Sequence, residues 1–213
     1  MKIAFLHTSP VHVQTFDGLM SPIPEMQARH DVEEAWLQEA VVGGVSELLH
    51  GKVSQRLIDL AEDADLVVCT CSTLAPIVDD LARESIVRVD RPAMRRAAQI
   101  QSEQPVFLVV CLPSTVDSSL RLLQGEFERV GQPPNIQLVV HEAAWAHFQA
   151  GDQGAFDTSI AERVRAEVQK LGGVSAVVLA QAPMRLAAKH LKGTVITTPE
   201  ALVAHIVNQE ESA

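Results

Sequence analysis

Short apolar runs alternate with amphipathic stretches along the whole chain. The β-branched run 66–68 is typical of a strand buried on both faces of a parallel sheet, and Pro76 behind it predicts the start of a helix. Comparable runs predict strands at 2–6, 86–89, 106–110, 135–140, 175–179 and 194–198, with a weaker strand at 30–32. This alternation of strands and helices predicts an α/β fold built on parallel sheets.

Helical patterns fill most of the intervals between these strands. The sequence predicts helices at 54–61 with Ser54 as N-cap, and at 76–82, 93–101, 117–129, 157–171 and 200–207. Residues 11–26 contain prolines and show little periodicity, so they predict a long loop that is a candidate lid. The pattern over 33–42 fits either a helix or a strand.

The pattern restarts near Gln104, so the chain predicts an internal duplication. Residues 106–115 echo 2–9, 175–184 echo 65–74, and 194–199 echo 86–92. We expect two similar α/β domains, 1–100 and 101–199, facing a shared cleft, with the closing helix at about 200–213 as a candidate to pack back on the first domain. In this alignment Gln181 takes the place of Cys71, and Cys111 takes the place of Leu6.

The loop after strand 66–68 holds the strongest candidate for chemistry. Cys71 follows the strand, and the loops at the carboxyl ends of strands are where open α/β sheets bind ligands. N–H groups at the start of the next helix stabilise a thiolate, so we expect the Cys71 thiol to titrate below its ordinary pKa of about 8.5. Cys69 lies on the strand itself and is interpreted as part of the core.

Composition excludes several kinds of partner. The 213 residues carry a formal net charge of -10 without a basic stripe, which argues against binding to nucleic acid or to an anionic membrane. No apolar run reaches membrane-spanning length, and three cysteines without a repeated spacing favour a reducing compartment, so we expect a cytoplasmic protein. The Cys69–Cys71 spacing is too tight for a zinc or redox pair, and we expect no metal.

Four segments together resemble the aspartate/glutamate racemase superfamily, which also includes hydantoin racemases, maleate isomerases and arylmalonate decarboxylases. They are Val68-Cys69-Thr70-Cys71-Ser72-Thr73, Arg88-Val89-Asp90-Arg91-Pro92-Ala93-Met94, Leu112-Pro113-Ser114-Thr115, and residues 177–184. The resemblance implies two facing parallel-sheet domains and no cofactor. It also implies a pair of cysteines, one per domain, on opposite faces of a carbon next to a carboxylate.

The chain departs from the family at the second cysteine, where it carries Gln181. Glutamine cannot exchange a proton at neutral pH, so a symmetrical two-base racemisation lacks one base. We expect a cofactor-independent enzyme in which the Cys71 thiolate transfers a proton, or adds, at the carbon alpha to the carboxylate of a small (di)carboxylic or amino acid. Racemisation, isomerisation and decarboxylation stay open, and the alternative is a non-catalytic carboxylate or amino-acid binding protein with the same fold.

The strand-end loops also supply hydroxyl and N–H donors for a substrate carboxylate. The candidates are Thr8, Ser9, Ser72, Thr73, Ser114 and Thr115. His7, His12 and Asp90 are candidates to assist. Hydroxyl groups at such junctions also cap helices whether or not a ligand binds. The partner we expect is a small carboxylate or amino-acid substrate, and a homodimer is left open.

Overall fold

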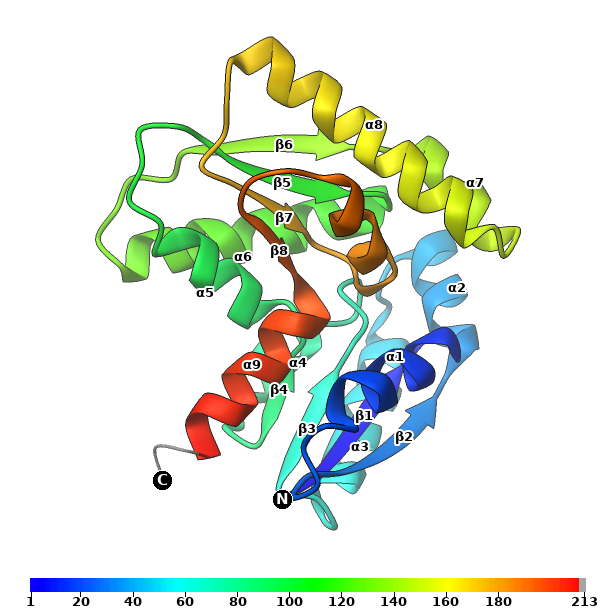
Figure 1. Ribbon diagram of the computed structural model, residues 1–213. Helices are drawn as coiled ribbons and strands as arrows, with labels where there is room; N and C mark the ends of the chain where they lie inside the picture. The colour runs from blue at the N-terminus through cyan, green and yellow to red at the C-terminus, as the bar shows by residue number, and fades with distance from the viewer. Residues whose placement is uncertain (211–213) are drawn as a thin grey trace. The chain divides into compact units, whose positions relative to one another are not determined.

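The computed structural model describes residues 1–210, and its contacts divide them into two compact units. The first unit is Met1–Val89 and the second runs from Asp90 onward. Each unit contains one four-stranded sheet in which every pair of neighbouring strands is parallel (Figure 1). The predicted α/β class with two similar parallel-sheet domains is therefore confirmed, while the last three residues of the predicted closing segment, 211–213, lie outside the described chain.

The first unit has strand order β2-β1-β3-β4. Its elements are β1 (Lys2–His7), α1 (Val11–Met20), β2 (Gln27–Val32), α2 (Glu34–Gly43), α3 (Glu47–Ala61), β3 (Leu66–Cys69), α4 (Pro76–Leu81) and β4 (Ile86–Arg88). Four apolar residues of α3, spaced three or four apart, are buried and place this helix against the sheet: Leu49, Val53, Leu57 and Leu60. Leu6, Val67 and Cys69 lie in the same core.

Two expectations for the first unit are wrong. Residues 11–20 form helix α1 and not a loop, because His12, Phe16 and Met20 recur every four residues and are all buried. The prolines that suggested a loop come after the helix has ended. Helix α3 begins well before the predicted start, because Ser46 and not Ser54 is its N-cap; the Ser46 side chain accepts a hydrogen bond from the Leu49 N–H.

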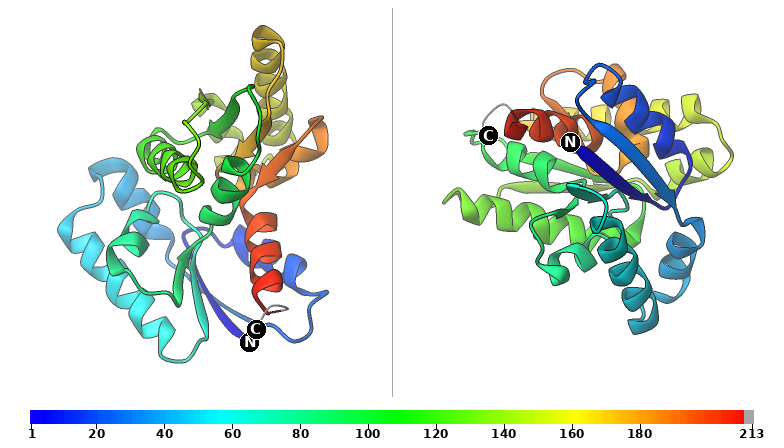
Figure 2. Two further views of the ribbon diagram at one scale, coloured as in Figure 1. Left: turned by 90° about the vertical axis from the view of Figure 1, so that its left-hand side faces the viewer. Right: turned by 90° about the horizontal axis from the view of Figure 1, so that it is seen from below.

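The second unit has strand order β6-β5-β7-β8. Its elements are α5 (Arg91–Ala98), β5 (Val106–Val110), η1 (Pro113–Thr115), α6 (Val116–Arg129), β6 (Ile136–Val140), α7 (Glu142–Gln149), α8 (Gln153–Leu171), β7 (Ala176–Leu179), η2 (Ala182–His190), β8 (Val195–Thr197) and α9 (Thr198–Glu210). Helices α5 and α6 cover one face of this sheet, and α7 and α8 cover the other (Figures 1 and 2). The sequence did not predict α7.

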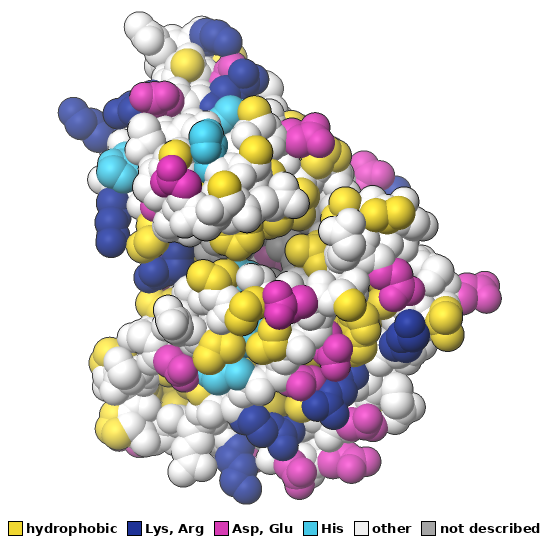
Figure 3. Space-filling view, turned by 90° about the vertical axis from the view of Figure 1, so that its right-hand side faces the viewer, with side chains coloured by type: hydrophobic (Ala, Val, Ile, Leu, Met, Phe, Trp, Pro, Cys, Tyr) yellow, Lys and Arg dark blue, Asp and Glu magenta, His cyan; other side chains and the backbone are white. Residues whose placement is uncertain are grey.

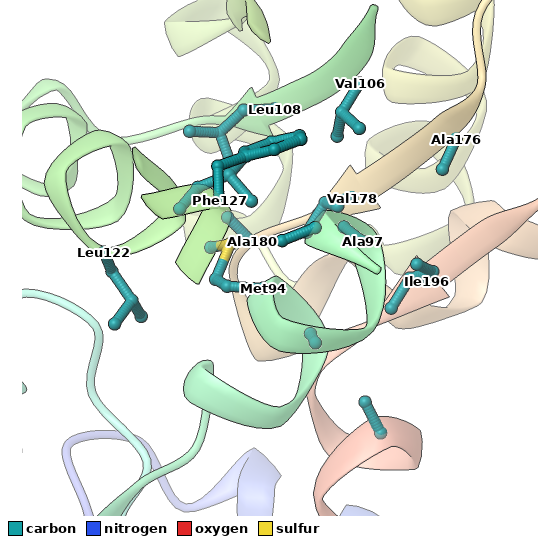
Figure 4. Close-up of a cluster of buried hydrophobic side chains, with 14 of the residues drawn as sticks. Met94, Ala97, Val106, Leu108, Leu122, Phe127, Ala176, Val178, Ala180 and Ile196 are labelled. Atoms are coloured by element: carbon teal, nitrogen blue, oxygen red, sulfur yellow. The ribbon is translucent and has the colours of Figure 1, made fainter. Parts of the chain in front are cut away.

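Helix α5 belongs to the second unit, although the expected boundary at residue 100 assigned it to the first. Its residues Met94 and Ala97 are fully buried in one core with Leu108 and Val178 of the second sheet (Figure 4). The boundary therefore lies between Val89 and Asp90. Helix α9 belongs to the second unit and contributes Ala201 to this core.

The two sheets repeat each other in register as well as in strand order. Leu6 of β1 is paired with Cys69 of β3, and Val109 of β5 is paired in the same way with Leu179 of β7. The first residue beyond each inner strand donates its N–H to the equivalent carbonyl, over 3.0 Å to Leu6 and 3.1 Å to Val109. Counting two residues beyond Cys69 and Leu179 makes Cys71 and Gln181 counterparts, as the sequence alignment predicted.

The same register corrects the expected counterpart of Cys111. Because Leu6 corresponds to Val109, Cys111 corresponds to Thr8 and not to Leu6. Leu112 then corresponds to Ser9. A thiol of the second unit thus stands where the first unit has a hydroxyl.

Charged side chains of both signs are interspersed on the surfaces of the units drawn in Figure 3. Within residues 1–210, no helix combines the length and the apolar character that crossing a membrane requires. Nor do three or more His, Cys, Asp or Glu side chains of the described residues gather where they could hold a metal ion.

Candidate active site

The first unit surrounds the Cys71 sulfur with hydrogen-bond donors. Thr8, just past β1, approaches the sulfur with its hydroxyl group. Thr73 contributes both its hydroxyl and its N–H, and Leu74 contributes its N–H. The turn between β3 and α4 folds these N–H groups back toward the cysteine, and the Leu74 N–H also lies 3.1 Å from the Cys71 carbonyl. The loops after β1 and β3 therefore form one polar half-site around the thiol.

Burial raises the pKa of the Cys71 thiol by more than these donors lower it. Cys71 is only 7 % exposed, and loss of water around the thiolate raises the pKa of the thiol above its ordinary value, although the Thr8 hydroxyl and the N–H groups of Thr73 and Leu74 act to lower it. The expectation of a thiol that titrates below 8.5 is therefore wrong. In the free protein Cys71 is a neutral thiol at neutral pH.

The other predicted donors of the first unit lie in the same two loops. Ser72 and Thr73 are buried in the turn after β3, and Ser9 is partly buried in the turn after β1. The Ser9 carbonyl accepts the His12 N–H at 3.3 Å and so begins α1. The structure thus brings Thr8 and Thr73 to the sulfur and places Ser9 and Ser72 beside them in sequence.

His7 is fully buried and makes hydrogen bonds away from the thiol. Its Nδ1 lies 2.8 Å from Thr70 Oγ1, and its Nε2 lies 2.8 Å from His30 Nδ1. His30 Nε2 in turn lies 3.0 Å from Asp17 Oδ1. The Thr70 hydroxyl donates to the Leu6 carbonyl at 3.0 Å, so its oxygen accepts from His7 Nδ1–H, and His7 Nε2 accepts from His30.

This chain of bonds fixes the two loops that form the half-site. His7 directly precedes Thr8 and Thr70 directly precedes Cys71, so the His7–Thr70 bond ties the end of β1 to the end of β3. Sequence reasoning missed Asp17, His30 and Thr70. His30 reaches His7 only because β2 pairs with β1. The one feature of the sequence that pointed to this pairing was the weak strand predicted at 30–32.

Burial also favours the neutral forms of His7 and His12. It lowers the pKa of His7 to about 3, with added repulsion from His12 and His30, and lowers the pKa of His12 to about 4. The rings of His7 and His12 lie 5.9 Å apart. Neither ring is recorded in contact with the Cys71 sulfur, so a direct role of His7 or His12 in proton transfer gains no support from this geometry.

In the second unit, the side chain of Gln181 is turned onto the end of β5. Its Oε1 accepts the Cys111 N–H at 2.6 Å and the Leu112 N–H at 3.2 Å, and the side chain is only 5 % exposed. Gln181 is thus a hydrogen-bond acceptor for two successive N–H groups. The predicted catalytic position holds a group that binds but cannot exchange a proton.

Burial is the cause that acts on the Cys111 thiol. Cys111 is fully buried, and burial raises the pKa of its thiol to about 12.

The remaining predicted site residues of the second unit are Ser114, Thr115 and Asp90. The Thr115 hydroxyl donates to the Leu112 carbonyl at 2.8 Å inside the turn of η1, and Ser114 lies exposed in the same turn. Asp90 is fully buried at the N-cap of α5, where its carbonyl accepts the Met94 N–H at 3.1 Å. The Thr115 hydroxyl therefore has a structural partner that accounts for its position.

Solved racemase structures share this architecture over almost the whole chain. Picrophilus torridus aspartate racemase matches with a TM-score of 0.72 and 17% identity, over 99% of this chain and 94% of that chain. The chain has the fold of the aspartate and glutamate racemases. A glutamate racemase from Francisella tularensis, in complex with D-glutamate, matches with a TM-score of 0.71 and 12% identity, over 99% of this chain and 81% of that chain.

The likeness in fold extends to allantoin racemases. The enzyme from Pseudomonas fluorescens matches with a TM-score of 0.64 and 12% identity, over 100% of this chain and 92% of that chain. No protein-family model and no curated protein sequence matches the chain. At these identities the likeness shows the fold, which confirms the resemblance at that level, and the reaction has to be argued from the residues.

Proposed function

We propose that the protein is a cofactor-independent enzyme of the isomerase or racemase type. In it Cys71 transfers a proton on one face of the carbon alpha to the carboxylate of a small carboxylic or amino acid. The observation that carries the proposal is the arrangement of donors from Thr8, Thr73 and Leu74 around a single sulfur. A structural cysteine in a core needs no such set of polar partners.

These donors explain how a thiol with a raised pKa does chemistry. The neutral thiol gives its proton to the alpha carbon of an enediolate, so that a C–H bond forms while the S–H bond breaks and the electron pair stays on sulfur. The Thr8 hydroxyl and the N–H groups of Thr73 and Leu74 then stabilise the thiolate. In the reverse direction the thiolate removes the same proton.

The second unit supports a reaction on one face only. At the position that the family resemblance assigns to the second thiol, the chain has Gln181, whose amide cannot exchange a proton. The pKa of the nearby Cys111 thiol, about 12, keeps it protonated. Proton delivery from one side fits an isomerisation or a decarboxylation better than free racemisation.

The test is incorporation of solvent deuterium, measured by NMR for both enantiomers of a panel of small carboxylic and amino acids. We expect exchange at the alpha position with a single stereochemical sense, and little or no loss of optical purity by chiral chromatography. Cys71→Ser should reduce the exchange rate at least about a hundredfold, because the serine hydroxyl is a far weaker acid.

A matched control is Cys111→Ser, which removes a thiol of the second unit and should leave exchange unchanged. Binding of an acid without exchange, in wild type and in Cys71→Ser alike, would instead identify a non-catalytic carboxylate-binding protein. Exchange that persists in Cys71→Ser would show that another residue is the base.

A further inference from the structure

The end of β5 carries two successive N–H groups that point at one oxygen. Cys111 N–H and Leu112 N–H lie 2.6 Å and 3.2 Å from Gln181 Oε1. Consecutive N–H groups that converge in this way form a concave site that binds anionic or carbonyl oxygens. The oxygen that fills it belongs to an uncharged amide on a side chain more than nine-tenths buried.

The first unit has the same pair of N–H groups without such an occupant. By register, Thr8 and Ser9 correspond to Cys111 and Leu112. Among residues 1–210, neither the Thr8 N–H nor the Ser9 N–H donates to a backbone carbonyl outside the regular helices and strands. The side chain at the position of Gln181 is here Cys71, whose sulfur has no oxygen to offer and meets the Thr8 hydroxyl instead.

We infer that Gln181 is a built-in ligand, whose amide oxygen occupies the oxygen-binding site formed by the N–H groups of Cys111 and Leu112. That site is thereby closed to outside carboxylates, and its counterpart at Thr8 and Ser9 is the one left open. A tethered group acts at an effective concentration in the millimolar range or higher, so a free carboxylate competes poorly with it. The inference deepens the proposed function and depends on it only in the choice of carboxylates as probes.

The test is a titration of the ¹⁵N-labelled protein with acetate, and separately with acetamide, followed by the backbone amide resonances. In wild type we expect acetate to shift the amides of Thr8 and Ser9 and to leave those of Cys111 and Leu112 in place. In Gln181→Ala the second pair should also shift saturably with either probe, at least about ten times more tightly than any response of that pair in wild type.

Two further variants keep this test decisive. Gln137→Ala removes the same amide from an exposed position of β6 and should behave as wild type. If Gln181→Ala fails to fold, Gln181→Glu retains the oxygen as a carboxylate. The Cys111 and Leu112 amide protons should then move downfield and stay insensitive to both probes, because a charged acceptor makes the stronger bond.

Either of two results would overturn the inference. One is a response of Cys111 and Leu112 to acetate that is as tight in wild type as in Gln181→Ala. The other is no response of these amides in a folded Gln181→Ala, together with unmoved resonances in Gln181→Glu. A wild type in which Thr8 and Ser9 do not respond, while the second pair behaves as expected, would count against the proposed carboxylate site and leave the role of Gln181 standing.

Discussion

The two units share one backbone plan and differ in the side chains at two equivalent positions. Cys71 and Thr8 in the first unit correspond to Gln181 and Cys111 in the second. In the first unit a thiol meets a hydroxyl donor, and in the second an amide oxygen meets N–H donors. The same strand-end geometry therefore supports an acid–base group in one half and a closed hydrogen-bonded pair in the other.

The comparison also shows why a thiol alone does not define a catalytic site. Cys111 lies at a strand end, as Cys71 does, but burial without donors raises the pKa of its thiol to about 12. At Cys71, burial also raises the pKa of the thiol, but hydrogen bonds from two hydroxyl groups and two N–H groups act to lower it. Both thiols have a raised pKa, and the donors around its sulfur are what distinguish Cys71.

The largest expected effect comes from making the two halves chemically alike. Gln181→Cys puts a second thiol at the counterpart of Cys71, where the N–H groups of Cys111 and Leu112 become donors to a thiolate. We expect racemisation of the acid that wild type exchanges on one face, with a gain of at least about a hundredfold over wild type. The measurement is loss of optical activity with solvent deuterium uptake, under reductant.

The double variant Cys71→Ala with Gln181→Cys is the control and should abolish racemisation again. Rapid racemisation by the wild-type protein would show that the chain already has two bases. Gln181 would then not occupy the position of the second base. No gain in the single variant, with its fold intact, would contradict the equivalence of the two half-sites in function.

The next effect concerns stability, since the histidine cluster of the first unit has no counterpart at the end of β5. The pKa values of His7 and His12 fall to about 3 and about 4 on folding, so between these values and 6.5 the unfolded chain binds more protons. The free energy of unfolding should therefore fall as the pH drops below about 6.5. From pH 7 to pH 5 we expect a loss of about 2–4 kcal/mol.

Urea unfolding can read this unit separately, because Trp36 lies in the first unit and Trp145 in the second. The fluorescence of a Trp145→Phe protein then follows Trp36. His12→Leu should remove about half of the pH dependence, while His147→Gln, at an exposed position, should leave it unchanged. A first unit equally stable at pH 7 and pH 5 would contradict the buried neutral state of both rings.

The sequence predicted the parts of this picture that depend on local pattern. Runs such as 66–68 and 106–110 identify buried strands, and their repetition identified the equivalence of Cys71 with Gln181. Helix α1 was missed because prolines close behind it masked the spacing of its buried residues. The predicted domain boundary was late because α5 is amphipathic toward a sheet that begins only after it.

The site was harder to predict because its properties arise from contacts distant in sequence. The His7–His30 bond depends on the pairing of β1 with β2. The direction of the Cys71 pKa shift depends on how completely packing excludes water, which a loop position and a short helix do not reveal. The sequence shows that Gln181 stands where the family has a base. It does not show that the amide oxygen of Gln181 accepts hydrogen bonds from the N–H groups of Cys111 and Leu112.

The three thiols should differ in reactivity because only Cys71 retains measurable exposure, 7 % against 0 % for Cys69 and Cys111. Mass-spectrometric mapping of iodoacetamide alkylation should find Cys71 modified first, and small dicarboxylates should slow the reaction. Because the pKa of the Cys71 thiol is raised, its alkylation rate should go on increasing at pH values above those at which an ordinary thiol titrates. Earlier modification of Cys111 would remove the distinction between the two thiols.

The smallest expected effect tests one donor of the first unit. Thr8→Val removes the hydroxyl at the Cys71 sulfur with little change of volume, so the pKa of the thiol should rise further. At a fixed pH near 8 this slows alkylation of Cys71 about tenfold or less, because only the thiolate reacts.

Thr115→Val, which removes a hydroxyl bonded to a backbone carbonyl in the second unit, should leave the rate unchanged. A faster reaction in Thr8→Val than in wild type would mean that Thr8 shields the sulfur rather than stabilising its thiolate, and the half-site would then owe its chemistry to the N–H groups of Thr73 and Leu74.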